Sequence, residues 1–431
     1  MGDLSATARR CWRALLLLAV MVGLSACGGD GGRLSSQPGR GETPVGALLA
    51  LTGPGSGLGI ASKSALEIAA SDLNADLARQ GSDVRMRIVV EDTKHDPAIA
   101  LQKLQALAAQ GVKIVIGPQS SSEVQALKAY ADEHGIIIIS QGSTSSALSI
   151  AGDNIFRVVP DDRLEAEALV ALMWADGIRS VVPLWRADLG NQGLHDSVQR
   201  TLAARGGTVT AGVRYPTTAQ DFTSVLPTIR VQVEQAAAGA GASTVAVYLA
   251  AFDEAVTVLD QARNDPVLSS VKWYGSDGAA QITGLPANAA AAAFAVKVGY
   301  PCPIYGLEDA LASKWQPVAD QIRAQTGITP DAFALSAYDA LRVAARAYVQ
   351  TRGVGNVATF KKALLETAES YSGITGSTAL NEAGDRKLGS FDFWGVCGAG
   401  GAFQWIRLAS YRSSSSGTGT LTRLSACAAL P

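Results

Sequence analysis

Short apolar runs alternate with amphipathic stretches along the first third of the chain. Four runs have the length of buried strands, at 45–51, 86–90, 113–117 and 136–139. The stretches between them place apolar residues on one stripe of a helix, at 62–77, 98–109 and 123–134. Continuous apolar strands that alternate with amphipathic helices predict a parallel sheet with both faces covered.

The same pattern restarts after Val158-Val159-Pro160. Asp162 and Glu165 have the spacing of a capping box and predict a helix that runs to about residue 174. Further strands are predicted at 180–184, 208–214, 244–249 and 271–274, with helices at 191–204, 221–235 and 253–263. The sequence therefore predicts a second α/β unit built like the first.

The last part of the chain is less regular. It predicts a strand at 294–298, helices at 307–325, 331–351 and 357–366, and β-structure at 387–394 and 402–408. A run rich in serine, glycine and threonine at 413–420 predicts a disordered tail over 413–431.

The N-terminus has the pattern of a targeting segment. Three arginines precede an apolar run of ten residues at 14–23, which is too short to span a bilayer as a helix. The following Leu24-Ser25-Ala26-Cys27 resembles the lipobox of bacterial lipoproteins, in which the cysteine is acylated and becomes the mature N-terminus. We expect a signal peptide over 1–26, lipidation at Cys27 and a flexible tether over 27–43; the alternative is an ordinary secretory signal with a chance cysteine.

Composition excludes several functions. The 431 residues carry a net charge of −2, which gives no electrostatic basis for nucleic-acid binding. Only three histidines are present, so a histidine-built metal site is not expected. The motifs G-x-S-x-G, the P-loop, H-E-x-x-H and C-x-x-C are all missing from the sequence. We therefore expect no enzyme, no cofactor and no metal.

The cysteines allow one disulfide in the mature chain. If Cys27 carries lipid, Cys302, Cys397 and Cys427 remain. Cys397 could pair with Cys302 or with Cys427, and spacing alone does not choose between them.

Two hydroxyl-rich segments follow the predicted strands of the first unit. Gln119-Ser120-Ser121-Ser122-Glu123 opens a helix, and a helix N-terminus with serine hydroxyls favours an anion. The alternative is that these serines only cap the helix, since Ser120 and Glu123 fit a capping box. The segment 140–146 carries five hydroxylated residues and no charge, which is typical of a ligand loop or of a solvated turn.

Candidate residues in the second unit are an acid and two aromatic side chains. Asp277 directly follows the strand at 271–274 and could pair with an ammonium group, although Ser-Asp-Gly is also an ordinary turn. Phe252 and Trp185 end two other strands, where they could stack on a ligand or lie in the core.

Several segments resemble, in order and spacing, the type I periplasmic binding proteins of the Leu/Ile/Val class, the solute receptors of ABC importers. They are Val45–Pro54, Val90-Glu91-Asp92 with Asp96-Pro97, Gly111–Pro118, Phe156–Pro160, Ser336–Ala340 and Gly373–Gly376. The resemblance covers about residues 44–410. It implies two Rossmann-like α/β lobes joined by three crossovers, with a ligand cleft between them. Lobe one would comprise 44–159 and 285–374, and lobe two 160–284 and 375–412.

The resemblance also implies roles for particular residues. Ser121, beside Ser122, would hold the ligand's carboxylate, and Gly142, Ser143 and Thr144 would bind its backbone atoms. Asp277 would pair with its ammonium group, and Phe252 would pack on it, with Trp185 nearby. Leu189 stands where relatives carry tyrosine, and Leu58 where an aromatic residue is common, which argues against an unmodified aliphatic amino acid bound in the usual way.

The expected function is that of a solute receptor. The resemblance implies a monomer, lipid-anchored in the cell envelope at the periplasmic or outer face of a membrane, that closes on a branched-chain amino acid or a related amino acid or amide. It would then deliver the solute to permease subunits of an ABC importer. The alternative is a sensor of the same fold that signals to a membrane receptor or kinase.

Overall fold

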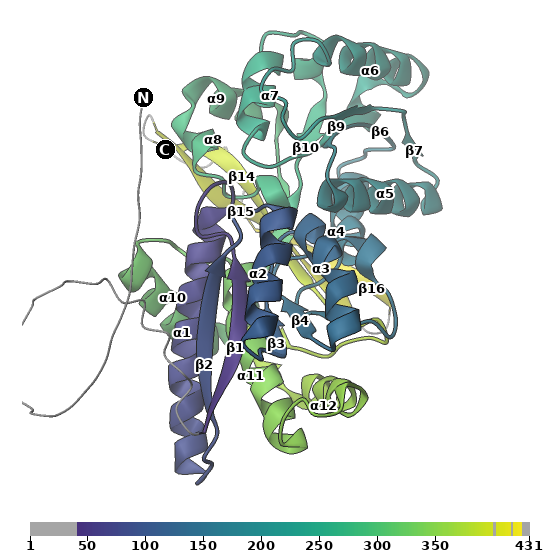
Figure 1. Ribbon diagram of the computed structural model, residues 1–431. Coiled ribbons are helices and arrows are strands. Elements are labelled where there is room, and N and C mark those ends of the chain that lie inside the picture. The colour runs from purple at the N-terminus through teal and green to yellow at the C-terminus, as the bar shows by residue number, and fades with distance from the viewer. Residues whose placement is uncertain (1–40, 400–401, 415–416, 425–431) are drawn as a thin grey trace, which may run out of the picture. The chain divides into compact units, whose positions relative to one another are not determined.

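The first sheet is parallel and has five strands. The computed structural model describes residues 41–399, 402–414 and 417–424, within a unit that begins at Gly39. The predicted signal peptide, Cys27 and nearly all of the predicted tether lie outside the described residues. The strand order is β2(Arg85–Asp92), β1(Glu42–Leu49), β3(Ile114–Ile116), β4(Ile137–Ser140), β5(Ile155–Arg157) (Figure 1).

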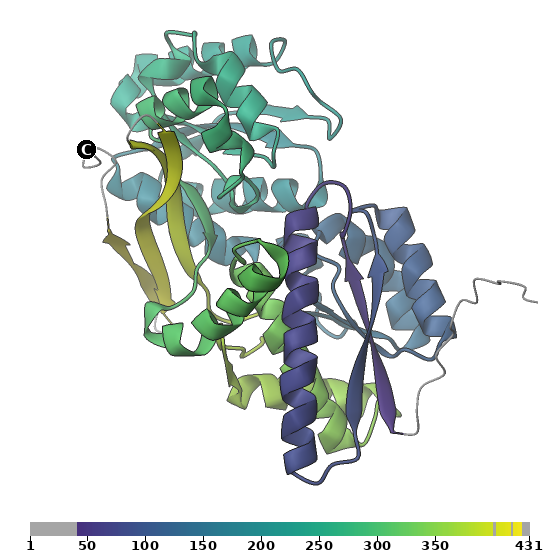
Figure 2. The same ribbon diagram turned by 90° about the vertical axis from the view of Figure 1, so that its left-hand side faces the viewer.

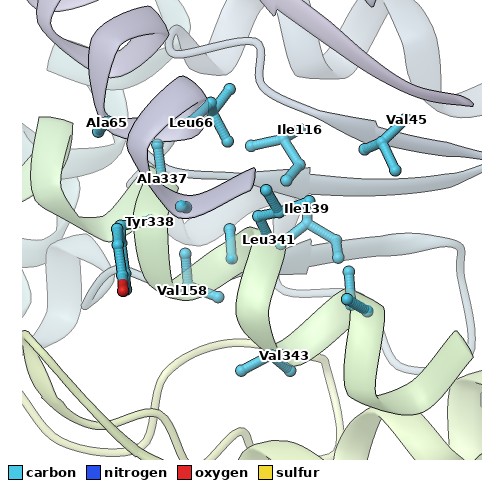
Figure 3. Close-up of a cluster of buried hydrophobic side chains, with 14 of the residues drawn as sticks. Val45, Ala65, Leu66, Ile116, Ile139, Val158, Ala337, Tyr338, Leu341 and Val343 are labelled. Atoms are coloured by element: carbon cyan, nitrogen blue, oxygen red, sulfur yellow. The ribbon is translucent and has the colours of Figure 1, made fainter. Parts of the chain in front are cut away.

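Helices cover both faces of this sheet, as the apolar strands predict. Alternate residues of a strand face opposite sides: Ile137 and Ile139 pack in one core cluster and Ile138 in another. The first cluster includes α1(Ser56–Arg79), which Figure 2 shows running along the sheet, and α11(Ala332–Thr351) (Figure 3). The second includes α2(Pro97–Ala109) and α3(Ser121–His134).

Local capping explains where two of these helices begin. The Asp96 carboxylate accepts hydrogen bonds from the backbone N–H groups of Ala98 and Ile99, at 2.8 and 2.9 Å, and Pro97 is the first residue of α2. Ser120 and Glu123 form the predicted capping box at the start of α3. The helix predicted at 98–109 and the predicted Ser120–Glu123 capping box are therefore confirmed.

The second sheet repeats the parallel construction. Its order is β10(Lys272–Tyr274), β9(Val245–Ala250), β6(Ser180–Arg186), β7(Thr208–Val209), and β8(Val213–Tyr215) also pairs with β6. The predicted strand at 208–214 is thus split in two. The helices of this unit are α4(Asp162–Ala175), α5(Leu189–Ala204), α6(Leu226–Ala240) and α7(Ala255–Ala262).

The predicted strand at 294–298 is wrong. These residues form the end of α9(Ala289–Val298), because Asn288 caps a run of five alanines, the strongest helix formers. Together with the short α8(Gly284–Ala287), α9 packs on the second sheet through Leu285, Phe294 and Val298. The sequence-based division placed these residues in lobe one. The chain returns to the first sheet's core only with α10(Ala312–Thr326), α11 and α12(Val357–Ser370).

A third, antiparallel sheet uses the C-terminal part of the chain. Its order is β11(Cys302–Tyr305), β14(Ser390–Ala399), β15(Ala402–Ser414), β16(Gly417–Arg423). The expected disorder over 413–431 is therefore wrong for the described part, since 417–423 pairs with β15. Threonines in 417–423 suit a strand once a partner is present, because β-propensity depends on the neighbouring strand. A two-stranded sheet, β12(Ser372–Gly373) with β13(Gly376–Ser377), lies between α12 and β14.

A buried ion pair joins two chain segments that are far apart in the sequence, one at the end of β5 and one at 385–386. Arg157, at the end of β5, donates from Nε to Oδ1 of Asp385 at 2.6 Å, and both side chains are buried. Arg386 donates from Nη1 to the carbonyl oxygen of Val158 and from Nη2 to that of Thr375. The segment around 157–158 and the segment around 375–386 are therefore tied together by buried side-chain contacts.

The cysteines settle one open alternative. Cys302 is a free, buried thiol, and Cys397 is disulfide-bonded. A bond between Cys302 and Cys397 is therefore excluded, and the partner of Cys397 lies outside the described residues. Among those residues, no helix is both long and apolar enough to cross a membrane.

Candidate functional site

Serine hydroxyls gather where β3 and β4 end. Ser121, the first residue of α3, is 5% exposed. Its Oγ accepts hydrogen bonds from Ser143 Oγ and from the backbone N–H of Ser145, each at 3.1 Å. Because both bonds are accepted, the proton of the Ser121 hydroxyl remains available for a further acceptor.

The loop that carries Ser143 is folded by the serine before it. Ser140 donates to the carbonyl oxygen of Pro118 at 2.6 Å and accepts from the backbone N–H groups of Gly142 and Ser143. At Gly142 a β-carbon would lie 2.9 Å from the backbone oxygen of Gln119, so a larger residue would push the two loops apart. The glycine thus permits the close approach that brings Ser143 to Ser121.

The start of α5 contacts these loops. Ser145 Oγ donates to the carbonyl oxygen of Leu189 at 3.1 Å, and the N–H of Leu189 lies 3.5 Å from Ser122 Oγ. An open pocket of about 410 Å³ lies beside this contact, lined by Ser146, Ala147, Arg163, Leu189, Gln192, Gly193, Asp196 and Arg200. Ser121, Ser122, Ser143 and Leu189 are therefore brought together by the fold.

Trp185 is covered by α5. Its ring stacks on that of His195, with the centroids 3.9 Å apart and an interplanar angle of 11°, and its Nε1 donates to Gln192. Only 8% of each residue is exposed. His195 is itself buried, and its imidazole covers one face of the Trp185 indole.

Phe252 lies where segments of both units meet. Its ring is 6.2 Å from that of His95, and the guanidinium of Arg186 is 5.3 Å from its centroid. It also packs against Gly278, where a β-carbon would lie 2.3 Å from the ring. Gly278 follows Asp277, so Phe252 and Asp277 are neighbours in space.

Asp277 presents an uncompensated carboxyl group. It begins the 3₁₀ helix η4(Asp277–Ala279), and its Oδ1 accepts from the backbone N–H of Gly278 at 2.7 Å. Burial, and then the like charges of Asp188 and Asp331, raise the pKa of Asp277 to about 6. Within the described part of the chain, no lysine, arginine or histidine forms an ion pair with it.

Two further buried acids surround Asp277, and sequence reasoning assigned them only to a helix cap. The cap of α4 is Asp161, whose carboxylate accepts from the N–H of Arg163 at 3.0 Å, so the predicted Asp162–Glu165 capping box is wrong. Glu165 Oε1 instead accepts from the backbone N–H of Asp277 at 3.2 Å. The only signal in the sequence was the density of acids at the start of α4.

Asp162 links the acids to the serine loop. Its Oδ2 accepts from the N–H of Ser146 at 3.3 Å, and its other oxygen is buried without a hydrogen bond. Burial, and then the charge of Asp277, raise the pKa of Asp162 to about 8, while a hydrogen bond with Thr144 opposes the shift. Thr144 is thus placed beside Asp162. We call Ser121, Ser143 and Ser145 the hydroxyl wall, and Asp162, Glu165 and Asp277 the acidic wall. Thr144 lies between these two walls.

Comparison with known families gives the class of this protein. The model of the family described as "Receptor family ligand binding region" matches residues 61–398, and the chain belongs to this family. Its fold is that of the type I periplasmic binding proteins. Members of the family and fold are solute-binding receptors rather than enzymes.

Three individual proteins are similar to this chain. An uncharacterized protein of Methanocaldococcus jannaschii, MJ1266, is 29% identical over 405 residues, which is 89% of this chain and 94% of that protein. The chemotactic signal transduction system substrate-binding protein BasB of Halobacterium salinarum is 29% identical over 138 residues, 30% of this chain and 33% of BasB. The branched-chain amino acid transporter substrate-binding protein LivJ of Streptococcus pneumoniae, solved with isoleucine, has a TM-score of 0.64 and 20% identity; the match covers 85% of this chain and 99% of LivJ.

Proposed function

We propose that the protein is an extracytoplasmic solute receptor of an ABC importer. It captures a small amino-acid-like solute, a branched-chain amino acid or a related amino acid or amide, between its two α/β units. Solute binding biases an equilibrium between open and closed forms, and the closed form engages the permease subunits. The receptor acts as a monomer.

The observation that carries this proposal is the contrast between Ser121 and Asp277. Ser121 offers a hydroxyl proton at the N-terminus of a 14-residue helix, which suits a carboxylate. Asp277 offers a carboxylate with no cation paired to it in the described residues, which suits an ammonium group. A zwitterionic amino acid carries both groups on one carbon.

The proposal leaves the solute's side chain to be found by experiment. Leu189 and Leu58 replace aromatic residues of the Leu/Ile/Val class, and both are half-buried. Trp185 is shielded by His195, so Phe252 is the aromatic ring best placed to contact a solute. Selectivity among amino acids would then follow from Phe252 and the two leucines.

The experiment uses the protein with four matched probes. L-Leucine carries both charged groups, 4-methylpentanoate lacks the amine, isopentylamine lacks the carboxylate, and L-glutamine has a different side chain. A probe at 100 times its Kd raises the stability by about 2.7 kcal/mol, which a thermal-shift assay detects. We expect a shift with an amino acid and none with either single-charge analogue. A shift with 4-methylpentanoate alone would contradict the assigned role of Asp277.

Lipid anchoring through Cys27 is part of the proposal. The sequence that supports it is Leu24-Ser25-Ala26-Cys27 after a basic and apolar segment. Expression of the Cys27→Ser variant in a host that processes lipoproteins should move the protein out of the membrane fraction. Wild-type protein should carry an acyl mass on the peptide that begins at Cys27, and an unmodified peptide there would contradict anchoring.

A sensor of the same fold is the second candidate, favoured by the similarity to BasB over 138 residues. Uptake separates the two roles. If deleting the gene abolishes import of the bound amino acid, the receptor serves transport. If import persists while a behavioural or transcriptional response to that amino acid is lost, it serves sensing.

A further inference from the structure

The Glu165 carboxyl group has an unusual position behind Asp277. It is 1% exposed and lies on the first turn of α4, with Oε1 accepting the backbone N–H of Asp277 at 3.2 Å. This bond places the side chains of Glu165 and Asp277 next to each other. No ion pair to Glu165 exists among the residues that the structure describes, and Arg157, which lies near Asp162, is paired with Asp385.

Two adjacent, buried carboxyl groups without a cation cannot both ionise cheaply. An uncompensated charge in a protein interior costs several kcal/mol, and a like charge at contact distance adds to that cost. The favourable arrangement keeps one proton between them, so that one group donates to the other. Asp277 is less enclosed than Glu165 and already accepts from the N–H of Gly278, so the proton belongs on Glu165.

We propose that Glu165 is a positioning residue of the solute site, which holds a proton and donates it to the Asp277 carboxylate, thereby fixing that carboxylate toward the solute's amine. This inference rests on the proposed function, in which Asp277 pairs with an ammonium group. Solute capture then depends on one shared proton as well as on the charge of Asp277.

The surroundings agree with this division of roles. Burial, and then the charges of Asp277 and Asp162, raise the pKa of Glu165 well above its ordinary value. The titratable and charged groups that face the pair from neighbouring elements are Asp162 of α4, Asp188 before α5, Asp331 before α11, Tyr248 of β9, Cys302 of β11 and Arg157 of β5. The two arginines near these groups are already paired, Arg157 with Asp385 and Arg186 with Asp188, so the surroundings favour the protonated acid.

The first test needs no solute. Thermal stability is measured from pH 4.5 to 8.5 for the wild type, for Glu165→Gln, and for the control Glu133→Gln, which removes an exposed carboxylate of α3. A carboxyl group with a raised pKa in the folded state stabilises the fold at low pH and loses this contribution as the pH rises. The Tm of Glu165→Gln should therefore increase relative to wild type as the pH rises, by several degrees. A difference that does not change with pH overturns the protonated state of Glu165.

The second test reads out positioning. Glutamine keeps the size and the donor of a protonated glutamic acid, whereas Glu165→Met keeps the length and removes the donor. With L-leucine at pH 7.5, we expect the Kd of Glu165→Gln within about threefold of wild type and that of Glu165→Met at least tenfold higher. If the glutamine variant binds as weakly as the methionine variant, Glu165 acts by its charge and the inference fails while the proposed function stands. If neither L-leucine nor any other standard amino acid binds the wild type, the proposed function fails and the positioning role fails with it.

Discussion

The two walls of the proposed solute site are chemically opposite. On the first unit, Ser121 Oγ accepts hydrogen bonds from Ser143 Oγ and from the N–H of Ser145, and Ser120 donates to Oε2 of Glu123. On the second unit, Asp277 and Glu165 meet with no cation between them in the described structure.

The difference between the two walls indicates how the solute is oriented in the proposed site. The hydroxyl wall is satisfied in the absence of a solute and can donate at little cost, so it tolerates an empty site. The acidic wall is satisfied only by a proton or a cation, so it carries the larger energetic penalty when empty. The acidic wall should therefore determine most of the affinity for the solute, and the hydroxyl wall should determine the orientation in which the solute binds.

The largest expected effect is at Asp277. Asp277→Asn keeps the size of the side chain and removes the charge that pairs with an amine. Truncating one partner of a buried charge pair costs about 2–5 kcal/mol, so the Kd for L-leucine should rise about 30-fold or more. Isothermal titration measures it, with Asp221→Asn, on an exposed loop, as the control. Equal affinity of Asp277→Asn and the wild type would show that the acidic wall does not bind the solute.

A smaller loss is expected at Ser121. Ser121→Ala removes one hydrogen bond to a carboxylate, and bonds to charged groups contribute about 1.5–3 kcal/mol. The Kd for L-leucine should rise by about tenfold or more, still less than for Asp277→Asn. A loss at Ser121 that exceeds the loss at Asp277 would reverse the ranking of the two walls.

The acidic wall should also make binding dependent on pH. An ammonium group needs Asp277 ionised, and its pKa in the folded protein is raised to about 6. The affinity for L-leucine is therefore retained above pH 6 and falls as the pH drops through that value, by about tenfold per unit well below it. Titrations at pH 7.5 and 5.0 test this, and an unchanged Kd at pH 5.0 would show that the ionised acid is not needed.

The smallest effect is expected at Ser122. Its Oγ lies 3.5 Å from the N–H of Leu189, at the limit of a hydrogen bond, so Ser122→Ala removes little. We expect the Kd for L-leucine to change by less than about threefold. A tenfold rise in Kd would instead show that Ser122 contacts the solute as directly as Ser121 does.

Local signals in the sequence predicted much of the fold. The apolar strands and the caps at Asp96 and Ser120 depend on neighbours a few residues away, and the structure confirms them. The strand predicted at 294–298 was wrong because a local signal, the Asn288 cap and the alanine run, favours a helix. The disorder predicted at 413–420 was wrong for 417–420 because β15 supplies a partner strand.

The candidate site was predictable only in part. Ser121, Ser143 and Asp277 follow strands, and the carboxyl ends of parallel strands meet at one edge of a sheet. Glu165 could not be found in this way, because its contact with Asp277 spans 112 residues and its local pattern fits a cap equally well. The shielding of Trp185 by His195 likewise depends on the rotation of α5 against β6.

The buried thiol of Cys302 provides a kinetic reporter for the second unit. The thiol is fully enclosed, and Gly275 packs directly on its sulfur. Burial also raises the pKa of the thiol. In the folded state an alkylating reagent therefore cannot reach the sulfur, and the reactive thiolate is not formed. The rate at which the Cys302 peptide becomes alkylated therefore counts openings of the β11 region. Comparing the alkylation rate with and without solute would show whether solute binding slows the transient opening of the second unit or leaves it unchanged.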